Sequence, residues 1–329
     1  MTKIRNYFVI FFLTVCTTAA AQRYSISPIN ADRVLDRDSL RTWVEFLCSP
    51  GLGGRATGTE GGRKTALWLE EQLRGTGLKP LGGTWRHGFL AGSSLARNVM
   101  GLIPGSYTNP PRYVVLMAHF DNLGTLGGRF YPGADANASG VAALLQITRM
   151  VTHMNECRKI YPHGLIVVAL DAKEKSHAGA EQLWREIAAG TLLDPVSGEN
   201  IRPSQIDLVV NLDQLGSTLA PVTRGNGRYL VMLSEEYSGR RNTLERVNRD
   251  PGFGFELAYD YYGSKDFTRL FYRQVSDQRV FLEQGIPAVM FTSGITFRNN
   301  KPEDDPSSLD YDILTARTRL IFFWLDKVL

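Results

Sequence analysis

The sequence predicts an α/β fold with three layers, in which a central, mixed but largely parallel β-sheet lies between two layers of helices. Short apolar segments, typical of strands buried on both faces, alternate with longer segments that have helical periodicity. The chain of 329 residues also contains no internal repeat and no low-complexity linker that would divide it. We therefore expect a single domain over residues 22–329, with catalytic groups at the carboxyl ends of its strands.

The expected elements follow in order along the chain. Residues 39–49 and 61–75 have apolar side chains at helical spacing, and a glycine-rich loop separates the two helices. The segments expected as strands are residues 98–103, 113–118, 164–171, 207–213, 229–233 and 286–292. Further helices are expected between or after these strands, at residues 139–153, 177–189, 239–248 and 308–328.

The composition is that of a soluble globular protein, with 43% hydrophobic and 21% charged residues. The formal net charge of +4 is small, and the Lys and Arg residues are scattered rather than clustered. A nucleic-acid-binding surface is therefore not expected.

The N-terminus has the features of a secretory signal peptide. Lys3 and Arg5 precede an apolar run over residues 7–15, and small residues lead to a cleavage site after Ala21. The run is too short for a stable membrane span, so residues 1–21 predict export to the periplasm or the extracellular space. The alternative is a lipoprotein acylated at Cys16, which the bulky Val15 before it disfavours.

Cleavage would leave Cys48 and Cys157. Export permits a disulfide between them, but two buried thiols are equally consistent with the sequence. No Cys-x-x-Cys motif is present, so neither a thiolate zinc site nor a redox motif is indicated.

Three polar residues follow apolar strands, namely His119, Glu174 and Asp213. Such positions meet at one edge of a parallel sheet, where ligands usually bind. Asp121, two residues after His119, could hold the second ring nitrogen of a metal-binding imidazole. Structural roles are the alternative, with His119 as a structural histidine and Asp213 as a turn cap.

Several segments together resemble the secreted two-zinc aminopeptidases, a family that also contains glutamate carboxypeptidase, glutaminyl cyclase and the transferrin receptor. The main segment is YVVLMAHFDNLGTLGGRFYPGADANASGVAALLQ, residues 113–146. The others are residues 51–80, 96–105, 164–183, 206–217 and 276–294. The resemblance covers most of the chain after the signal peptide, and it implies the same fold.

The resemblance also implies a metal site, and this chain departs from it. Of the five expected metal ligands, His119, Glu174 and Asp213 are retained. Ala136 stands where the bridging Asp is expected, and Lys173 stands at the position of the general base. A methyl group cannot bridge two metal ions, and a charged amine cannot accept a proton from water.

The C-terminal part of the implied site is altered too. Asn299 and Asn300 align with a Tyr-His pair that would supply an oxyanion donor and the last ligand. The last histidine in the chain is His177, so no shift of this alignment restores a C-terminal histidine. Asp135 and His177 are candidate replacement ligands, and Asp277 and Asp304 are further ones.

Two functions follow from this pattern. The first is an exported, catalytically inactive homologue that binds a peptide or protein ligand, with no metal or a single weakly bound zinc. In that case Lys173 either belongs to a charged surface turn or lies against Glu174 and Asp213 in place of the lost cation. The second is an active metallo-aminopeptidase with a rearranged zinc site. A serine hydrolase is not indicated, because the chain has no Gly-x-Ser-x-Gly motif.

Overall fold

The computed structural model describes residues 28–106, 109–220, 226–234, 239–261 and 263–329. The expected signal peptide and Cys16 therefore lie outside the described residues. Within the described ranges, no helix is long and apolar enough to cross a membrane. Cys48 and Cys157 are both free thiols.

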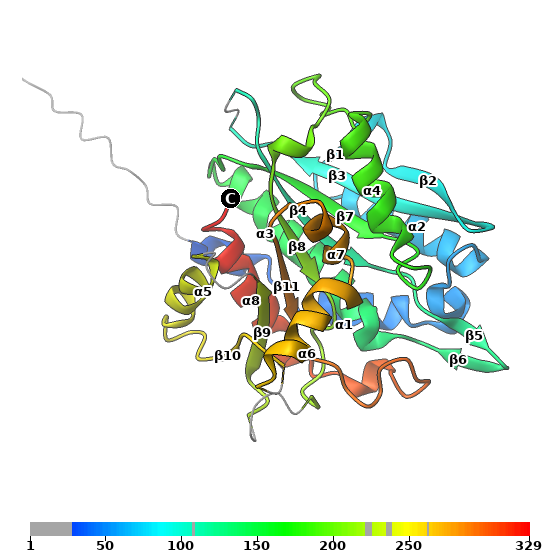
Figure 1. The fold of residues 1–329 in the computed structure, drawn as a ribbon. Coiled ribbons are helices and arrows are strands. Elements are labelled where there is room, and N and C mark those ends of the chain that lie inside the picture. Colours follow the sequence, from blue (N-terminus) through cyan, green and yellow to red (C-terminus); the bar gives the residue numbers. More distant parts are fainter. Residues whose placement is uncertain (1–27, 107–108, 221–225, 235–238, 262) are drawn as a thin grey trace, which may run out of the picture.

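Helices and strands alternate along most of the chain (Figure 1). The helices are α1 (Arg37–Leu47), α2 (Glu60–Arg74), α3 (Gly140–Glu156), α4 (Ala178–Ala189), α5 (Arg240–Asn248), α6 (Lys265–Leu270), α7 (Gln278–Glu283) and α8 (Tyr311–Leu325). The strands of the main sheet are β1 (Lys79–Pro80), β2 (Arg86–Ala91), β3 (Ser94–Ile103), β4 (Tyr113–His119), β7 (Gly164–Leu170), β8 (Ile206–Leu212), β9 (Tyr229–Ser234), β10 (Glu256–Ala258) and β11 (Ala288–Thr292). A separate hairpin consists of β5 (Gly124–Leu126) and β6 (Arg129–Tyr131).

The nine described strands of the main sheet run in the order β1-β3-β7-β4-β8-β11-β9-β10, and β2 pairs with β3. The central strands β7, β4, β8 and β11 are parallel, whereas β3 and β9 run antiparallel to their inner neighbours. This confirms the predicted mixed sheet with a parallel centre. The ends of β4, β7 and β8 therefore lie along one edge.

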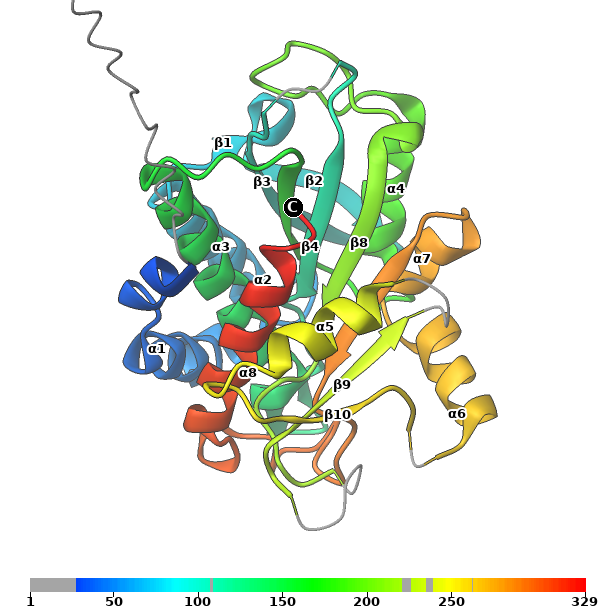
Figure 2. The ribbon, with the colours of Figure 1, turned by 90° about the vertical axis from the view of Figure 1, so that its left-hand side faces the viewer.

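Helices cover both faces of the sheet (Figure 2). On one face, α1, α2, α3, α5 and α8 enclose the larger apolar core, and on the other α4 and α7 enclose a second core. Alternate residues of β4 enter the two cores, with Leu116 in the first and Val115 and Met117 in the second. Such strands appear as continuous apolar runs in the sequence because both faces are buried.

Local signals set several helix boundaries. The carboxylate of Asp36 accepts hydrogen bonds from the first N–H groups of α1, and Thr59 and Asp310 cap α2 and α8 in the same way.

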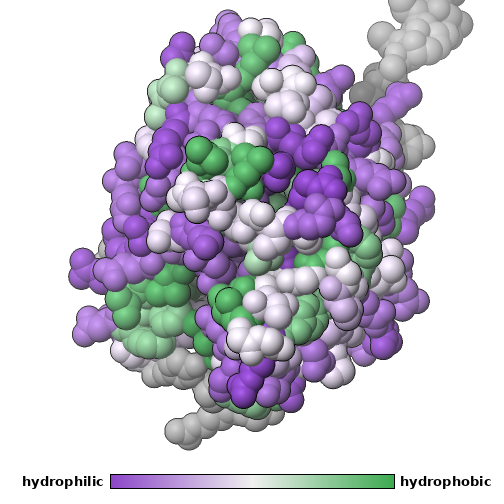
Figure 3. Space-filling model, turned by 90° about the vertical axis from the view of Figure 1, so that its right-hand side faces the viewer, coloured by the Kyte–Doolittle hydropathy of each residue, from purple (hydrophilic) through white to green (hydrophobic). Residues whose placement is uncertain are grey.

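The surface on the side of the β2–β3 hairpin is mostly polar, with separate apolar patches (Figure 3). Leu90 and Leu95 of this hairpin are both exposed.

Candidate functional site

His119 and Asp213 meet at the carboxyl edge of the sheet. His119 is the last residue of β4, and Asp213 directly follows β8, which runs parallel to β4. The Nε2 atom of His119 lies 3.6 Å from Asp213 Oδ1, and the two side chains are 0% and 8% exposed. The register of two parallel strands therefore brings together residues that are far apart in the sequence.

Asp121 connects His119 to the turn after β7. The Nδ1 atom of His119 lies 3.1 Å from the Asp121 carbonyl oxygen and 3.6 Å from its Oδ1. The Asp121 carboxylate also accepts hydrogen bonds of 3.0 Å from the backbone N–H groups of Lys173 and Glu174. One side chain thus orients the imidazole and holds the turn that carries the next two charges.

The Lys173 ammonium group lies among carboxylates. Its Nζ donates a 2.9 Å hydrogen bond to Glu174 Oε1, and the two side chains are 18% and 23% exposed. Burial alone would lower the pKa of Lys173, but the carboxylates of Asp213 and Glu174 outweigh burial and raise it. The sequence allows residues 173–175 to form a charged surface turn or Lys173 to lie against the two carboxylates. Lys175 is exposed and fits the surface turn. Lys173 instead faces Glu174 and Asp213.

Neighbouring opposite charges also shift the pKa values of His119 and Asp213. Burial would lower the pKa of His119, but Asp121 and Asp213 raise it to about 10. Burial would raise the pKa of Asp213, but His119 and Lys173 hold it well below its usual range, helped by a 2.6 Å hydrogen bond from Ser276 Oγ. We call five side chains at this edge the ionic cluster: His119, Asp121, Lys173, Glu174 and Asp213.

The loop before α3 carries Ala136, which is 4% exposed and offers only a methyl group. The neighbouring Asp135 carboxylate accepts hydrogen bonds from Gly216 N at 2.8 Å and Ser139 Oγ at 3.1 Å. The carboxylate of Asp304 accepts from the backbone N–H groups of Asp135 and Ala136, at 2.8 and 3.0 Å. Asp135 therefore binds Ser139 and the backbone after β8, and the loop is fixed by Asp304.

A buried arginine ties this loop to its surroundings. Arg55 is 0% exposed, and its guanidinium group donates to four backbone carbonyl oxygens, those of Leu47, Phe120, Pro132 and Gly133. These contacts join α1 to the segments before and after the β5–β6 hairpin. The glycine-rich loop between the first two helices thus supplies a structural support that sequence reasoning did not single out.

His177 is directed to Asp277. Its Nδ1 lies 3.1 Å from Asp277 Oδ1, and both residues are buried. The helix α4 begins only at Ala178, and His177 has a left-handed φ of 60°. His177 and Glu174 therefore do not share a helical turn, which was the condition for His177 to act as a replacement ligand.

The two asparagines near the C-terminus differ in their surroundings. Asn299 Oδ1 accepts a 2.8 Å hydrogen bond from Gln214 Nε2, next to Asp213 in the chain. Asn300 is exposed and has a φ of 57°. Further along this segment, the Asp304 carboxylate accepts a hydrogen bond from the backbone N–H group of Ala136.

Thr57 and Asp171 form a buried hydrogen-bonded pair next to Asp121, and sequence reasoning missed this pair. Thr57 Oγ1 donates to Asp171 Oδ1 at 2.9 Å and lies 3.4 Å from Asp121 Oδ2. Burial and the nearby charge of Asp121 raise the pKa of Asp171 to about 7. The position of Asp171 directly after β7 was the available signal, since strand ends in this sheet carry the polar groups.

The backbone around the ionic cluster is strained. Ala172, Ser176, His177 and Gln214 have φ angles of 61°, 61°, 60° and 65°, in the left-handed region that favours glycine. Such residues cost about 1–3 kcal/mol each and persist where the surrounding contacts demand them, typically at active sites and ligand sites. The strain marks this edge as a candidate site.

The donor groups at this edge are few. In the part of the chain that the structure describes, no group of three or more His, Cys, Asp or Glu side chains is arranged so as to hold a metal ion. His119 and Asp213 approach each other, while Glu174 is engaged by the Lys173 ammonium group.

A mixed sheet with a parallel centre between two helical layers, with this cluster at the carboxyl edge of the central strands, defines an aminopeptidase-like α/β fold. The sequence model of peptidase family M28 matches residues 98–325, so the chain belongs to this family. No curated protein matches the sequence.

Solved structures agree on the fold. The LapA aminopeptidase of Legionella pneumophila has a TM-score of 0.68 at 15% identity, over 92% of this chain and 74% of that one. BSAP, a zinc aminopeptidase from Bacillus subtilis, has a TM-score of 0.68 at 13% identity, over 89% and 95%. The Porphyromonas gingivalis glutaminyl cyclase has a TM-score of 0.65 at 19% identity, over 90% and 99%.

Proposed function

We propose that this chain is an exported, catalytically inactive member of family M28 that binds a peptide or protein ligand at the ionic cluster without hydrolysing it. It acts in the periplasm or the extracellular space. The observation that carries the proposal is the Lys173 ammonium group, 2.9 Å from Glu174 Oε1 and near Asp213. A lysine cation occupies the place where a metal enzyme of this fold is expected to hold its general base.

The position of Lys173 removes general-base catalysis. A general base must accept a proton from the attacking water, and an ammonium group held charged by two carboxylates has no lone pair to accept it. Loss of a general base alone lowers a rate by about 10²–10⁴. Of the carboxylates beside Lys173, Glu174 is occupied by this ion pair and Asp213 by His119 and Ser276.

The donor set does not fit a two-zinc centre. Two such ions, about 3.5–4 Å apart, need a shared anion between them, and Ala136 supplies none. A catalytic zinc normally has three protein ligands, whereas His119 and Asp213 supply two. We infer that the protein holds no metal, or at most a single weakly bound zinc.

The alternative, an active peptidase with a rearranged zinc site, needs replacement ligands. Asp135 would have to leave Gly216 and Ser139, which would leave buried partners unsatisfied at a cost of about 1–3 kcal/mol. His177 precedes α4 with a left-handed φ of 60°, so it does not share a helical turn with Glu174. These contacts favour the inactive homologue.

The charge of the ionic cluster supports a ligand with a cationic group. His119 and Lys173 are cations, and the three carboxylates of Asp121, Glu174 and Asp213 outnumber them by one (2 − 3 = −1). An excess negative charge favours a cationic group such as the free amino terminus of a peptide. Titration calorimetry with trialanine and N-acetyl-trialanine should show binding of the first and weaker binding of the second. Equal binding of the two peptides would contradict the proposal that the ionic cluster binds the free amino terminus.

Activity is tested with aminoacyl p-nitroanilides in excess zinc, with and without a chelator. We expect no turnover above the rate in buffer, because neither general base nor bridged metals are provided. Chelator-sensitive hydrolysis at ordinary enzymatic rates by the unmodified protein would overturn the proposal and favour the rearranged zinc site.

A further inference from the structure

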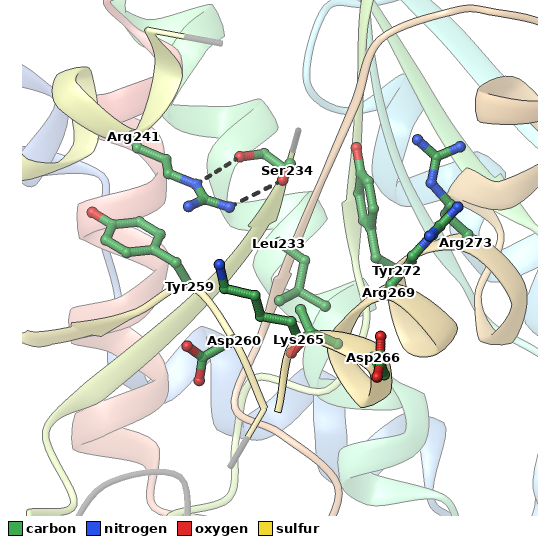
Figure 4. Close-up of a pocket in the computed structure, with 11 residues that line it drawn as sticks. Leu233, Ser234, Arg241, Tyr259, Asp260, Lys265, Asp266, Arg269, Tyr272 and Arg273 are labelled. Atoms are coloured by element: carbon green, nitrogen blue, oxygen red, sulfur yellow. Dashed lines mark hydrogen bonds between the residues drawn. The ribbon is translucent and has the colours of Figure 1, made fainter. Parts of the chain in front are cut away.

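A cavity separate from the ionic cluster lies where β9 and β10 meet α5 and α6 (Figure 4). Its volume is about 630 Å³, within the range of small-molecule sites. None of its lining residues belongs to the ionic cluster.

The lining of this cavity is rich in cations. Among its described lining residues, four side chains are cationic, those of Arg241, Lys265, Arg269 and Arg273, and two are acidic, those of Asp260 and Asp266. Within the described ranges, neither Lys265 nor Arg269 forms an ion pair with an acidic side chain. An anion placed between the Lys265 and Arg269 side chains would therefore be stabilised.

Arg241 is held in place on one side of the cavity. Its Nε and Nη2 donate to Ser234 Oγ at 3.3 Å and to Ser234 O at 3.1 Å, as Figure 4 shows. The guanidinium group also lies over the ring of Tyr259, 4.9 Å from its centroid, and the Tyr259 hydroxyl donates to Glu245. A guanidinium group fixed by neighbours loses little entropy when its remaining N–H groups bind an anion.

The opposite side has a rigid wall and two further cations. The Tyr272 hydroxyl donates a 2.6 Å hydrogen bond to the carbonyl oxygen of Ala288, which fixes the ring against the start of β11. Arg269 and Arg273 are four residues apart, on α6 and on the helical turn Phe271–Val275 that continues it. Side chains at this spacing share one face of a helix, so both arginines can reach the same ligand.

From this arrangement we propose that the cavity binds a small polyanion with at least two acidic groups, whether phosphate, sulfate or carboxylate. Arg241 and Lys265 bind one acidic group, and Arg269 and Arg273 bind the other. Arginine offers planar pairs of N–H donors that suit all three kinds of acid. This binding site is independent of the function proposed for the ionic cluster.

The test is titration calorimetry at low salt with three probes: tripolyphosphate, citrate and a disulfated disaccharide. We expect at least one probe to bind, and the preferred probe identifies the kind of acid. Lys265→Met and Arg269→Gln should each weaken binding about tenfold, as expected from the loss of one charge-assisted hydrogen bond. Both side chains are exposed, so neither variant should disturb folding, and thermal unfolding followed by circular dichroism checks this.

The matched control is Arg246→Gln, which removes an exposed cation of α5 that does not line the cavity. We expect this variant to bind the probe as the unmodified protein does. The proposal is overturned if none of the three probes binds, or if Arg246→Gln weakens binding as much as Lys265→Met does.

Discussion

Replacement of Lys173 by methionine tests whether its ammonium group stabilises the carboxyl edge of the sheet. Lys173→Met keeps the length of the side chain and removes the charge, which leaves Glu174 and Asp213 without their shared cation. Removing one partner of a buried ion pair costs about 3–5 kcal/mol, whereas an exposed pair contributes about 0–1 kcal/mol. Because Lys173 and Glu174 are 18% and 23% exposed, we expect an intermediate loss. The expected decrease in the free energy of unfolding is about 2 kcal/mol.

The matched control is Lys175→Met, two residues further along the same turn. Lys175 is exposed, so its replacement should change the free energy of unfolding by less than about 0.5 kcal/mol. Urea denaturation near neutral pH, followed by tryptophan fluorescence, measures both variants against the unmodified protein. If Lys173→Met is as stable as Lys175→Met, the lysine does not replace a cation at this site and the reasoning fails.

Two further predictions concern stability. Burial raises the pKa values of Asp135 and Asp171 from 3.8 to about 7, so the folded state binds protons more tightly than the unfolded state between these values. The free energy of unfolding should therefore decrease between about pH 4 and about pH 7, by on the order of 4 kcal/mol for each carboxyl over the whole interval. Urea denaturation at the two pH values measures this decrease in the free energy of unfolding. The variant Asp135→Asn should show a smaller decrease. A rise in stability with pH over this interval would contradict the prediction. Separately, Asp304→Ala leaves two buried backbone N–H groups of the Ala136 loop without acceptors, and should cost about 3 kcal/mol. The same measurement on Glu303→Ala, which changes an exposed neighbour, should show almost no loss, and equal effects would refute the role of Asp304.

The main elements of the fold could be predicted because each leaves a strong local signal. The strands β4 and β7 are buried along their whole length, so they appear as uninterrupted apolar runs. By contrast, β2 is not one of the central strands, and its burial pattern is irregular. The helix α6 buries none of its residues. Neither gives a clear periodicity, and both were missed.

The positions of the site residues could be predicted, but the directions of their side chains could not. His119 and Asp213 end parallel strands, so their meeting follows from the order of the chain. Asp135 accepts a hydrogen bond from Gly216 and His177 pairs with Asp277, and both of these partners lie far away in the sequence. The left-handed backbone at His177, which sets it outside α4, has no signature in the residue type.

The most direct test of the central claim is the zinc content of the unmodified protein after dialysis against excess zinc and then against metal-free buffer. The claim is that the Lys173 ammonium group, rather than a metal pair, balances the carboxylates at the edge of the sheet. Plasma mass spectrometry should find far less than one zinc ion per chain. The variant that carries Ala136→Asp and Lys173→Glu should retain more zinc, because it regains a bridging carboxylate and loses the competing cation. Retention of one or two zinc ions per chain by the unmodified protein would contradict the claim.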